Sequence, residues 1–74
     1  MNETRFHTLS TLEALGPVTA RKLAHLLGAR REATAMLLMR ARRDGLVYYR
    51  PRSGRHGLSD RGRARLAWLR GRRS

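Results

Sequence analysis

The stretch 27–47 constrains the fold of this chain more than any other. It opens with a Leu-Gly pair ending at Gly28, which suits a tight turn. Residues 31–44 then carry apolar side chains at the spacing of one helix face. Gly45 is the residue type that ends a helix in a left-handed conformation, and the apolar residues up to Val47 begin a strand. The pattern predicts a turn, a helix, a glycine stop and a strand.

The predicted helix over residues 31–44 has an inner and an outer side. At 100° per residue, the inner side takes Thr34, Leu37, Leu38 and Ala41. The outer side combines charged, small and sulfur-containing residues: Glu32, Met36, Met39 and Arg43, flanked by Ala33, Ala35, Arg40 and Arg42. Two alternatives stay open for the methionines. They belong to the core if the helix is rotated, or they meet a protein partner.

Residues 2–15 are predicted to form the first helix. Apolar side chains recur every third residue, forming a stripe that drifts slowly around a helix and is predicted to pack against a core: Phe6, Leu9, Leu12 and Leu15. Asn2 or Thr4 could cap the start. Gly16 followed by Pro17 ends the helix.

A second helix is expected over residues 20–27, after a short extended link. Thr19 fits its N-cap, and Leu23, Leu26 and Leu27 are predicted to be its buried side. Gly28 closes it, leaving a short glycine-containing connection to the next helix, which is the spacing of a helix-turn-helix.

The C-terminal part reads as a hairpin and a last helix. Residues 46–50 and 56–59 predict two strands joined by a turn with a basic tip. Ser59 suits the cap of a helix over residues 60–71, with Leu66 and Leu69 as its core positions, and residues 71–74 are expected to be a frayed basic tail. The predicted fold is therefore mainly α with one small β-hairpin.

Charge gives the strongest compositional signal. The 74 residues contain 17 Lys and Arg against 5 Asp and Glu, for a formal net charge of +12. So large an excess on so small a body favours a polyanionic partner, most often nucleic acid. An arginine-rich source or a solubilising surface is the alternative.

Other chemistry has little support in the sequence. There is no cysteine, the acids are scattered, and the three histidines lack the spacing of metal ligands. We therefore expect no enzyme activity, no metal site, no cofactor and no small-molecule ligand. No run approaches the length of a membrane span and the N-terminus is unlike a signal peptide, so a cytoplasmic, nucleoid-associated protein is expected.

Two motifs carry a resemblance to a known fold family. Leu27-Gly28, the helix and Asp44-Gly45-Leu46-Val47 match the Leu-Gly and Gly-Leu-Val frame of MarR-like, PadR-like and ArsR-like transcriptional regulators. The segment from Leu58 to Arg63 is similar to the Leu-Thr-x-x-Gly-Arg segment that closes their wing. The chain thus resembles a winged helix-turn-helix domain: a three-helix core, a two-stranded wing and a C-terminal helix.

The resemblance implies double-stranded DNA binding and transcriptional regulation. The helix over residues 31–44 would be the major-groove recognition helix, the hairpin would contact the backbone or the minor groove, and the start of the second helix would lie near a phosphate. The residues implied to contact DNA are Thr19, Arg21, Lys22, Arg30, Arg31, Glu32, Ala35, Met36, Met39, Arg40, Arg43, Arg50, Arg52, Ser53 and Arg55.

Two departures from the family pattern leave further alternatives. Arg30 stands where such regulators usually carry a Ser or Thr cap, and the long flanking helices of MarR-like dimers are missing. A homodimer or partner surface is expected at Ala64, Ala67 and Trp68. In the competing interpretation, Trp68 is a core residue that covers the first helix. A winged helix used for protein contact or DNA architecture, in a phage, replication or recombination complex, is the alternative function.

Overall fold

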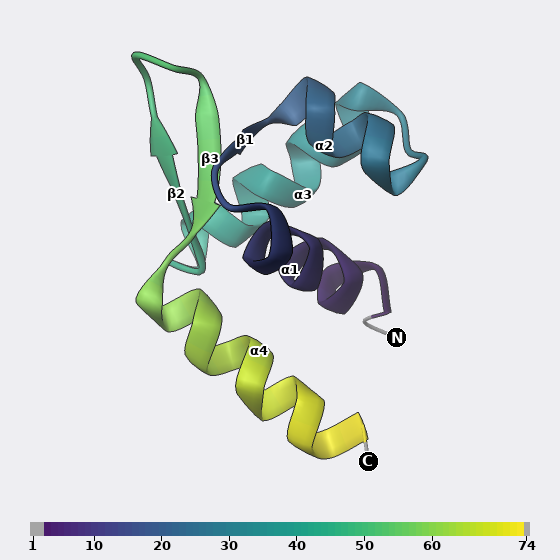
Figure 1. Cartoon of the computed structure of the whole chain (residues 1–74), viewed down its shortest axis with the longest axis vertical. Helices are drawn as coiled ribbons and strands as arrows, with labels where there is room; N and C mark the ends of the chain where they lie inside the picture. The colour runs from purple at the N-terminus through teal and green to yellow at the C-terminus, as the bar shows by residue number, and fades with distance from the viewer. Residues whose placement is uncertain (1–2, 74) are drawn as a thin grey trace.

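The computed structural model describes residues 3–73, which form a mainly helical fold with one small antiparallel sheet. Figure 1 shows the elements in chain order. Their bounds are α1 Glu3–Leu15, β1 Val18–Thr19, α2 Ala20–Leu27, α3 Arg31–Arg43, β2 Val47–Arg50, β3 Arg55–Leu58 and α4 Asp60–Arg73.

The sheet has three strands rather than the two predicted for the hairpin. Its order is β1-β3-β2, and both pairings are antiparallel. Val18 lies opposite His56 and Thr19 opposite Arg55, so the segment expected to be a plain extended link is an edge strand. A two-residue strand shows no alternation in sequence; it exists because β3 offers it unpaired backbone groups.

The core is built mainly from leucine. The side chains less than 2% exposed include Leu9 and Leu12 of α1, Leu23 of α2, Leu38 of α3 and Leu66 of α4. Each fully buried leucine stabilises the fold by roughly 1.5–3 kcal/mol. Every helix therefore contributes at least one leucine to the same cluster, which is how so short a chain obtains a core.

Two leucines predicted to be buried are exposed. Leu15 is 44% exposed because an every-third-residue stripe moves 60° per step and reaches the far side of α1 from Phe6. Leu26 is 47% exposed, since the short α2 turns Leu23 and Ala24 inward instead. In both helices the spacing of apolar residues predicted the helix correctly but not which residues form the centre of its buried face.

Helix ends follow the predicted capping residues. The Oγ1 atom of Thr19 accepts a hydrogen bond from the Lys22 N–H at 3.2 Å, and Gly28 adopts φ 65° after α2. Gly45, with φ 76°, stops α3 at Arg43, one residue earlier than predicted, and Asp44 is its C-cap.

The ends of the chain differ from the predictions. Helix α4 continues to Arg73, so a frayed tail from residue 71 is wrong over the part that the structure describes. Thr4 lies inside α1 rather than before it, and Asn2, the other predicted cap, lies outside the described residues.

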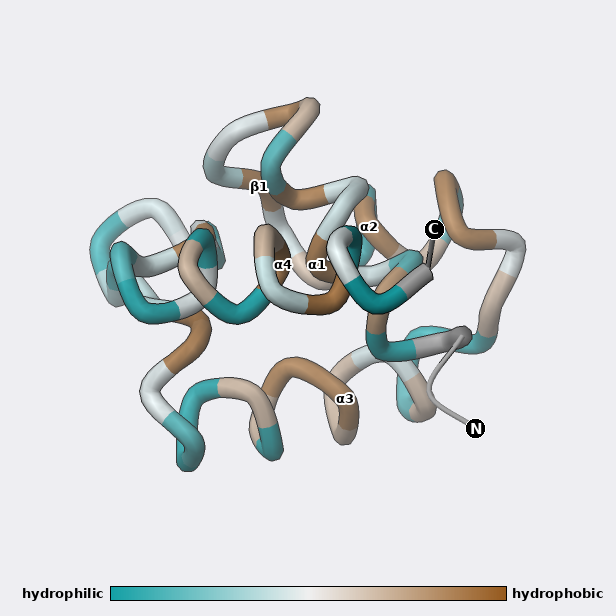
Figure 2. Tube along the Cα trace, turned by 90° about the horizontal axis from the view of Figure 1, so that it is seen from below, coloured by the Kyte–Doolittle hydropathy of each residue, from teal (hydrophilic) through white to brown (hydrophobic). Residues whose placement is uncertain are grey.

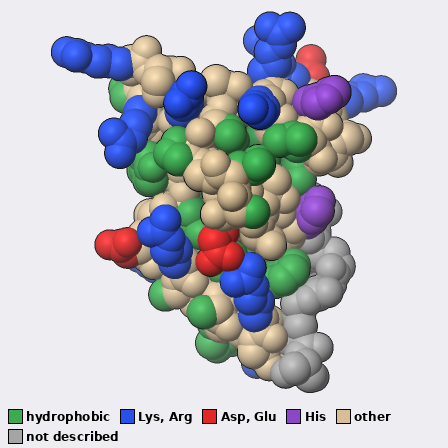
Figure 3. Space-filling model, in the orientation of Figure 1, with side chains coloured by type: hydrophobic (Ala, Val, Ile, Leu, Met, Phe, Trp, Pro, Cys, Tyr) green, Lys and Arg blue, Asp and Glu red, His purple; other side chains and the backbone are tan. Residues whose placement is uncertain are grey.

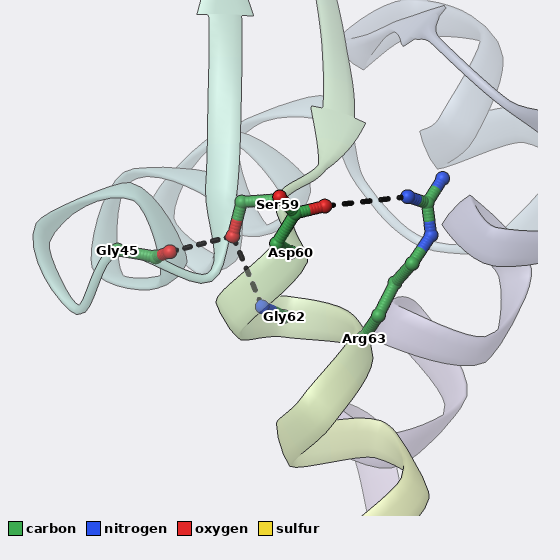
Figure 4. A network of polar contacts seen from close by, with 5 residues as sticks. All are labelled: Gly45, Ser59, Asp60, Gly62 and Arg63. Atoms are coloured by element: carbon green, nitrogen blue, oxygen red, sulfur yellow. Dashed lines mark hydrogen bonds and ion pairs between the residues drawn. The ribbon is translucent and has the colours of Figure 1, made fainter.

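Ser59 joins the hairpin, the end of α3 and the start of α4. Its hydroxyl donates a hydrogen bond to the Gly45 carbonyl at 2.6 Å and accepts one from the Gly62 N–H at 3.0 Å, as Figure 4 shows. Asp60 and Arg63 form an ion pair beside this junction at 3.8 Å. The predicted cap of α4 therefore also fixes where α4 leaves the sheet.

Close backbone packing at this junction requires glycine. A Cβ at Gly62 would overlap the carbonyl oxygen of Leu46. The first turn of α4 thus rests directly on the chain that leads into β2. Figure 2, seen from below, shows α3 along one side of the molecule, and its buried Leu38 lies in the same core cluster as leucines of α1 and α4.

Candidate nucleic-acid interface

The inner and outer sides of α3 are those that the sequence predicted. Thr34, Leu38 and Ala41 are buried and Leu37 is half-buried, whereas Met36 and Met39 are 48% and 52% exposed. The alternative that the methionines belong to the core is therefore wrong. Glu32, Ala35, Arg40 and Arg43 are also exposed, so the whole predicted outer side is free to meet a ligand.

Cations lie at both ends of α3. Arg30 occupies the N-cap position without a side-chain capping hydrogen bond, and Arg31 begins the helix. The N-terminus of a helix carries free N–H groups and a positive partial charge. Two arginines at this end are therefore electrostatically unfavourable, and a bound anion would relieve the repulsion. The C-terminal turn carries Arg40, Arg42 and Arg43, where the dipole favours cations.

The start of α2 lies beside the hairpin because of β1. Thr19 pairs with Arg55 in the sheet and caps α2 through its side chain. Arg21 and Lys22, in the first turn of α2, are exposed. The third strand, which the sequence did not reveal, thus brings the α2 cations toward those of the hairpin.

The hairpin itself concentrates positive charge on one sheet face. Arg50 and Arg55 lie directly opposite each other across β2 and β3. Like charges in this position destabilise a hairpin. Arg52 and Ser53 are exposed in the turn between the strands, next to Gly54 with φ 68°. The opposed arginines destabilise the free protein, and a bound anion would offset their repulsion, so this surface suits an anionic ligand.

Aromatic residues that were not predicted as site residues support these arginines. The Arg50 guanidinium carbon lies 5.1 Å from the centroid of the Tyr48 ring, which covers Gly57 so closely that a Cβ there would overlap it. Arg42 lies 5.0 Å from the Tyr49 ring, which links the end of α3 to β2. Adjacent residues of a strand point to opposite faces of the sheet, so the two tyrosines were predictable as contacts on both faces, and this is the sequence signal that could have identified them.

His56 completes the second of these stacks. Its ring centroid lies 4.7 Å from that of Tyr49, and its Nδ1 atom is buried without a hydrogen-bond partner. Burial lowers the pKa of His56 below its usual value of 6.5, and the charge of Arg42 lowers it further. The neutral imidazole therefore packs between α3 and the hairpin without adding charge.

Carboxylates pair with some of the arginines of α1 and α4. Glu13 of α1 pairs with Arg70 of α4 at 2.7 Å, and Arg5 of α1 pairs with Asp44 at 3.0 Å. Among the described residues, no ion pair joins a carboxylate to a cation of α2, α3 or the hairpin. Figure 3 shows basic side chains over the upper part of the molecule, with an acidic group beside those at the upper right, and acidic side chains beside basic ones in the lower part.

The structure brings most of the predicted residues into this upper half. All of the residues implied to contact DNA are exposed apart from Thr19, which is half-buried by its capping role. In Figure 1, α2, α3 and the hairpin occupy the same end of the molecule. Ala64, Ala67 and Trp68 lie on α4, and Trp68 is 55% exposed, so the interpretation of Trp68 as core is wrong.

The described residues contain no group of three or more His, Asp or Glu residues that could hold a metal ion. None of the helices within residues 3–73 combines the length and the apolar character needed to cross a membrane.

Comparison with models of known protein families, with curated proteins and with solved structures finds no match to this chain.

Proposed function

We propose that the protein is a winged helix-turn-helix module that binds double-stranded DNA as a transcriptional regulator. Helix α3 enters the major groove, and the β2–β3 hairpin acts as the wing on the backbone or in the minor groove. The three residues 28–30 between α2 and α3, with Gly28 at their start, have the length and composition of a helix-turn-helix connection.

One observation carries this proposal: the exposed cations of α2, α3 and the hairpin lie at one end of the molecule without carboxylate partners among the described residues. Phosphate contacts provide most of the affinity of proteins for DNA and fix their orientation on the duplex. The opposed pair Arg50 and Arg55, destabilising in the free protein, becomes favourable beside a phosphate backbone.

The outer side of α3 supplies the residues for base contacts. A helix of 13 residues is about 20 Å long, and a major groove about 12 Å wide admits one helix. Arginines at the helix ends suit phosphates or guanine edges, and Glu32 can accept a hydrogen bond from cytosine. Ala35, Met36 and Met39 can pack against thymine methyl groups, a contact open to apolar side chains.

The test is selection of a preferred duplex from a random pool, followed by salt titrations with that duplex and a shuffled one. We expect the selected site to bind at least ~10³-fold more tightly than the shuffled sequence. The logarithm of the binding constant should fall with the logarithm of salt at about −0.9 per phosphate contact. Equal binding to both duplexes would rule out sequence-specific recognition.

Met36→Ala distinguishes α3 as a base reader from α3 as a protein-binding surface. We expect it to change the selected sequence, while Leu26→Ala, which truncates an exposed apolar side chain on α2, leaves the selected sequence unchanged. Selection repeated with both variants provides the measurement.

A second candidate function is a winged helix used for protein contact or DNA architecture. The exposure of Met36 and Met39 favours it, because exposed apolar side chains close together often mark partner surfaces. Unchanged DNA binding by Met36→Ala, together with loss of a protein partner in a pull-down, would establish this alternative over the first.

A further inference from the structure

One flank of α4 carries a second basic surface, away from the hairpin. Arg61, Arg65, Trp68 and Arg72 follow one another at intervals of four, three and four residues, which places them along one side of a helix. We call them the Trp68 stripe. The core residues of this helix, Leu66 and Leu69, point to α1 instead.

Trp68 has the most exposed large apolar side chain in the described part of the protein, at 55%. The Arg72 guanidinium carbon lies 4.9 Å from its ring centroid and that of Arg65 lies 5.9 Å away. Arg65 and Trp68 also line a shallow recess. These cation–π contacts hold the indole ring on the surface while the guanidinium N–H groups stay available to an anion.

The charges around the stripe indicate what it binds. Asp60 pairs with Arg63 and Glu13 with Arg70, both off the stripe. Within the described residues, the arginines of the stripe take part in no ion pair. A second copy of the chain would set its own arginines against these, so self-association through this face is opposed by like charge. A ligand of negative charge is complementary to it.

We propose that the Trp68 stripe binds single-stranded nucleic acid, with one base stacked on the indole and the flanking phosphates on Arg65 and Arg72. Unpaired bases present flat faces to aromatic side chains, whereas bases inside a duplex are stacked on each other and closed to a surface ring. An acidic peptide supplies negative charge but not the aromatic faces. Along the helix, Arg61 and Arg65 are about 6 Å apart and Arg65 and Arg72 about 10.5 Å apart, so the stripe presents a line of cations that a phosphate backbone can follow.

This inference does not depend on duplex binding by α3, since the residues of the stripe belong to α4 alone. The stripe begins near the end of α3, where the side chain of Arg61 lies next to Gly45. The protein would therefore have two nucleic-acid surfaces of different kinds, one for paired and one for unpaired strands.

Trp68 is the sole tryptophan, so its fluorescence reports on this site directly. The full chain is titrated with oligothymidylate, with a blunt duplex of equal length and with polyglutamate. Stacking of a base on the ring is expected to quench the emission with oligothymidylate to saturation. The duplex and polyglutamate should leave most of the emission unquenched.

Variants are compared by the anisotropy of labelled oligothymidylate. Trp68→Ala should weaken binding by about 5- to 150-fold, the range for loss of one base–aromatic stack. Arg65→Ala and Arg72→Ala should each lower the salt slope by about 0.7. Arg63→Ala is the matched control, because it removes the same charge from the opposite flank of the same helix and should keep the wild-type slope.

Several results would overturn the proposal in wild type and variants whose circular dichroism shows them folded. Absence of quenching by oligothymidylate would end it, and equal quenching by polyglutamate would make the stripe a site for acidic protein. An equal loss in Arg63→Ala would show unspecific attraction. Arg52→Ala separates the two proposals, since it should weaken duplex binding and leave the Trp68 quenching unchanged.

Discussion

The two halves of this molecule are both rich in arginine but treat the charge differently. Glu13 of α1 pairs with Arg70 of α4, and Asp44, the C-cap of α3, pairs with Arg5 of α1, so both ion pairs join elements distant in sequence. At the other end, the hairpin sets Arg50 against Arg55, and neither has a carboxylate partner among the described residues. The net charge of +12 does not reveal this difference in ion pairing between the two halves. The comparison teaches that the distribution of carboxylates, more than the number of cations, indicates where a polyanion binds.

The largest expected effect lies at the junction of the two halves. Gly62→Ala places a methyl group against the Leu46 carbonyl, which cannot move without shifting the chain that enters β2. We expect a loss of about 3 kcal/mol in the free energy of unfolding, as for severe overpacking. Denaturation by urea, followed by circular dichroism, measures it.

Gly71→Ala is the matched control for this change. It replaces a glycine of the same helix, but its added Cβ meets nothing within 4 Å. It should stabilise the protein by roughly 0.5–1 kcal/mol through helix propensity. Similar stability in the two variants would contradict close packing of α4 on the Leu46 backbone.

A medium effect should separate the two halves of the molecule in duplex binding. The double substitution of Arg50 and Arg55 with Ala removes two proposed phosphate contacts, so the salt slope should become shallower by about 1.8. Its stability should not fall, because a cross-strand repulsion disappears. Salt titrations and urea denaturation of the same samples measure both quantities.

Arg63 and Arg70, replaced together by Ala, provide the comparison. This variant removes the same charge but also the pairs with Asp60 and Glu13, so we expect a normal salt slope and a stability loss of roughly 0–1 kcal/mol per pair. If both double variants flatten the slope equally, the duplex does not distinguish the two halves of the molecule.

The smallest effect concerns His56, at the contact between α3 and the hairpin. Its pKa is lowered in the folded protein, so the unfolded chain binds a proton more readily. The contribution of His56 to stability is therefore complete above pH 6.5 and declines as the pH falls below that value. Urea denaturation between pH 5 and 8 should show this decline.

His56→Gln removes the titrating group and should flatten this part of the stability profile. His7→Gln, on the exposed side of α1, serves as the control and should keep the wild-type profile. A wild-type profile in His56→Gln would mean that the stacked imidazole has no part in the pH dependence.

Most of the secondary structure could be predicted because its signals are local. Thr19 and Ser59 mark helix starts because each side-chain oxygen accepts a hydrogen bond from the backbone N–H three residues later. Gly28 and Gly45 mark helix ends because they adopt positive φ angles that other residues rarely adopt. The outer side of α3 followed from the helical period alone. Each of these features is decided within one or two turns of chain.

The candidate site was predicted in part. The exposed arginines of α3 and the hairpin followed from patterning, but the stacks of Tyr48 on Arg50 and of Arg42 on Tyr49 did not. They depend on which sheet face each tyrosine takes and on how α3 docks on β2. The predicted burial of Leu26 was wrong and that of Trp68 was left open, since the burial of an apolar residue depends on whether another element covers it.

The sequence by itself determined the order of the elements, their approximate ends and the large positive charge, because capping, glycine and helical period act between near neighbours. Only the tertiary structure decided that residues 18–19 join the sheet, that Glu13 and Asp44 pair with arginines of α4 and α1, and that Trp68 stands exposed between two arginines. These outcomes arise where segments far apart in the chain meet. Their free energy comes from pairing and packing partners that no short stretch of sequence contains.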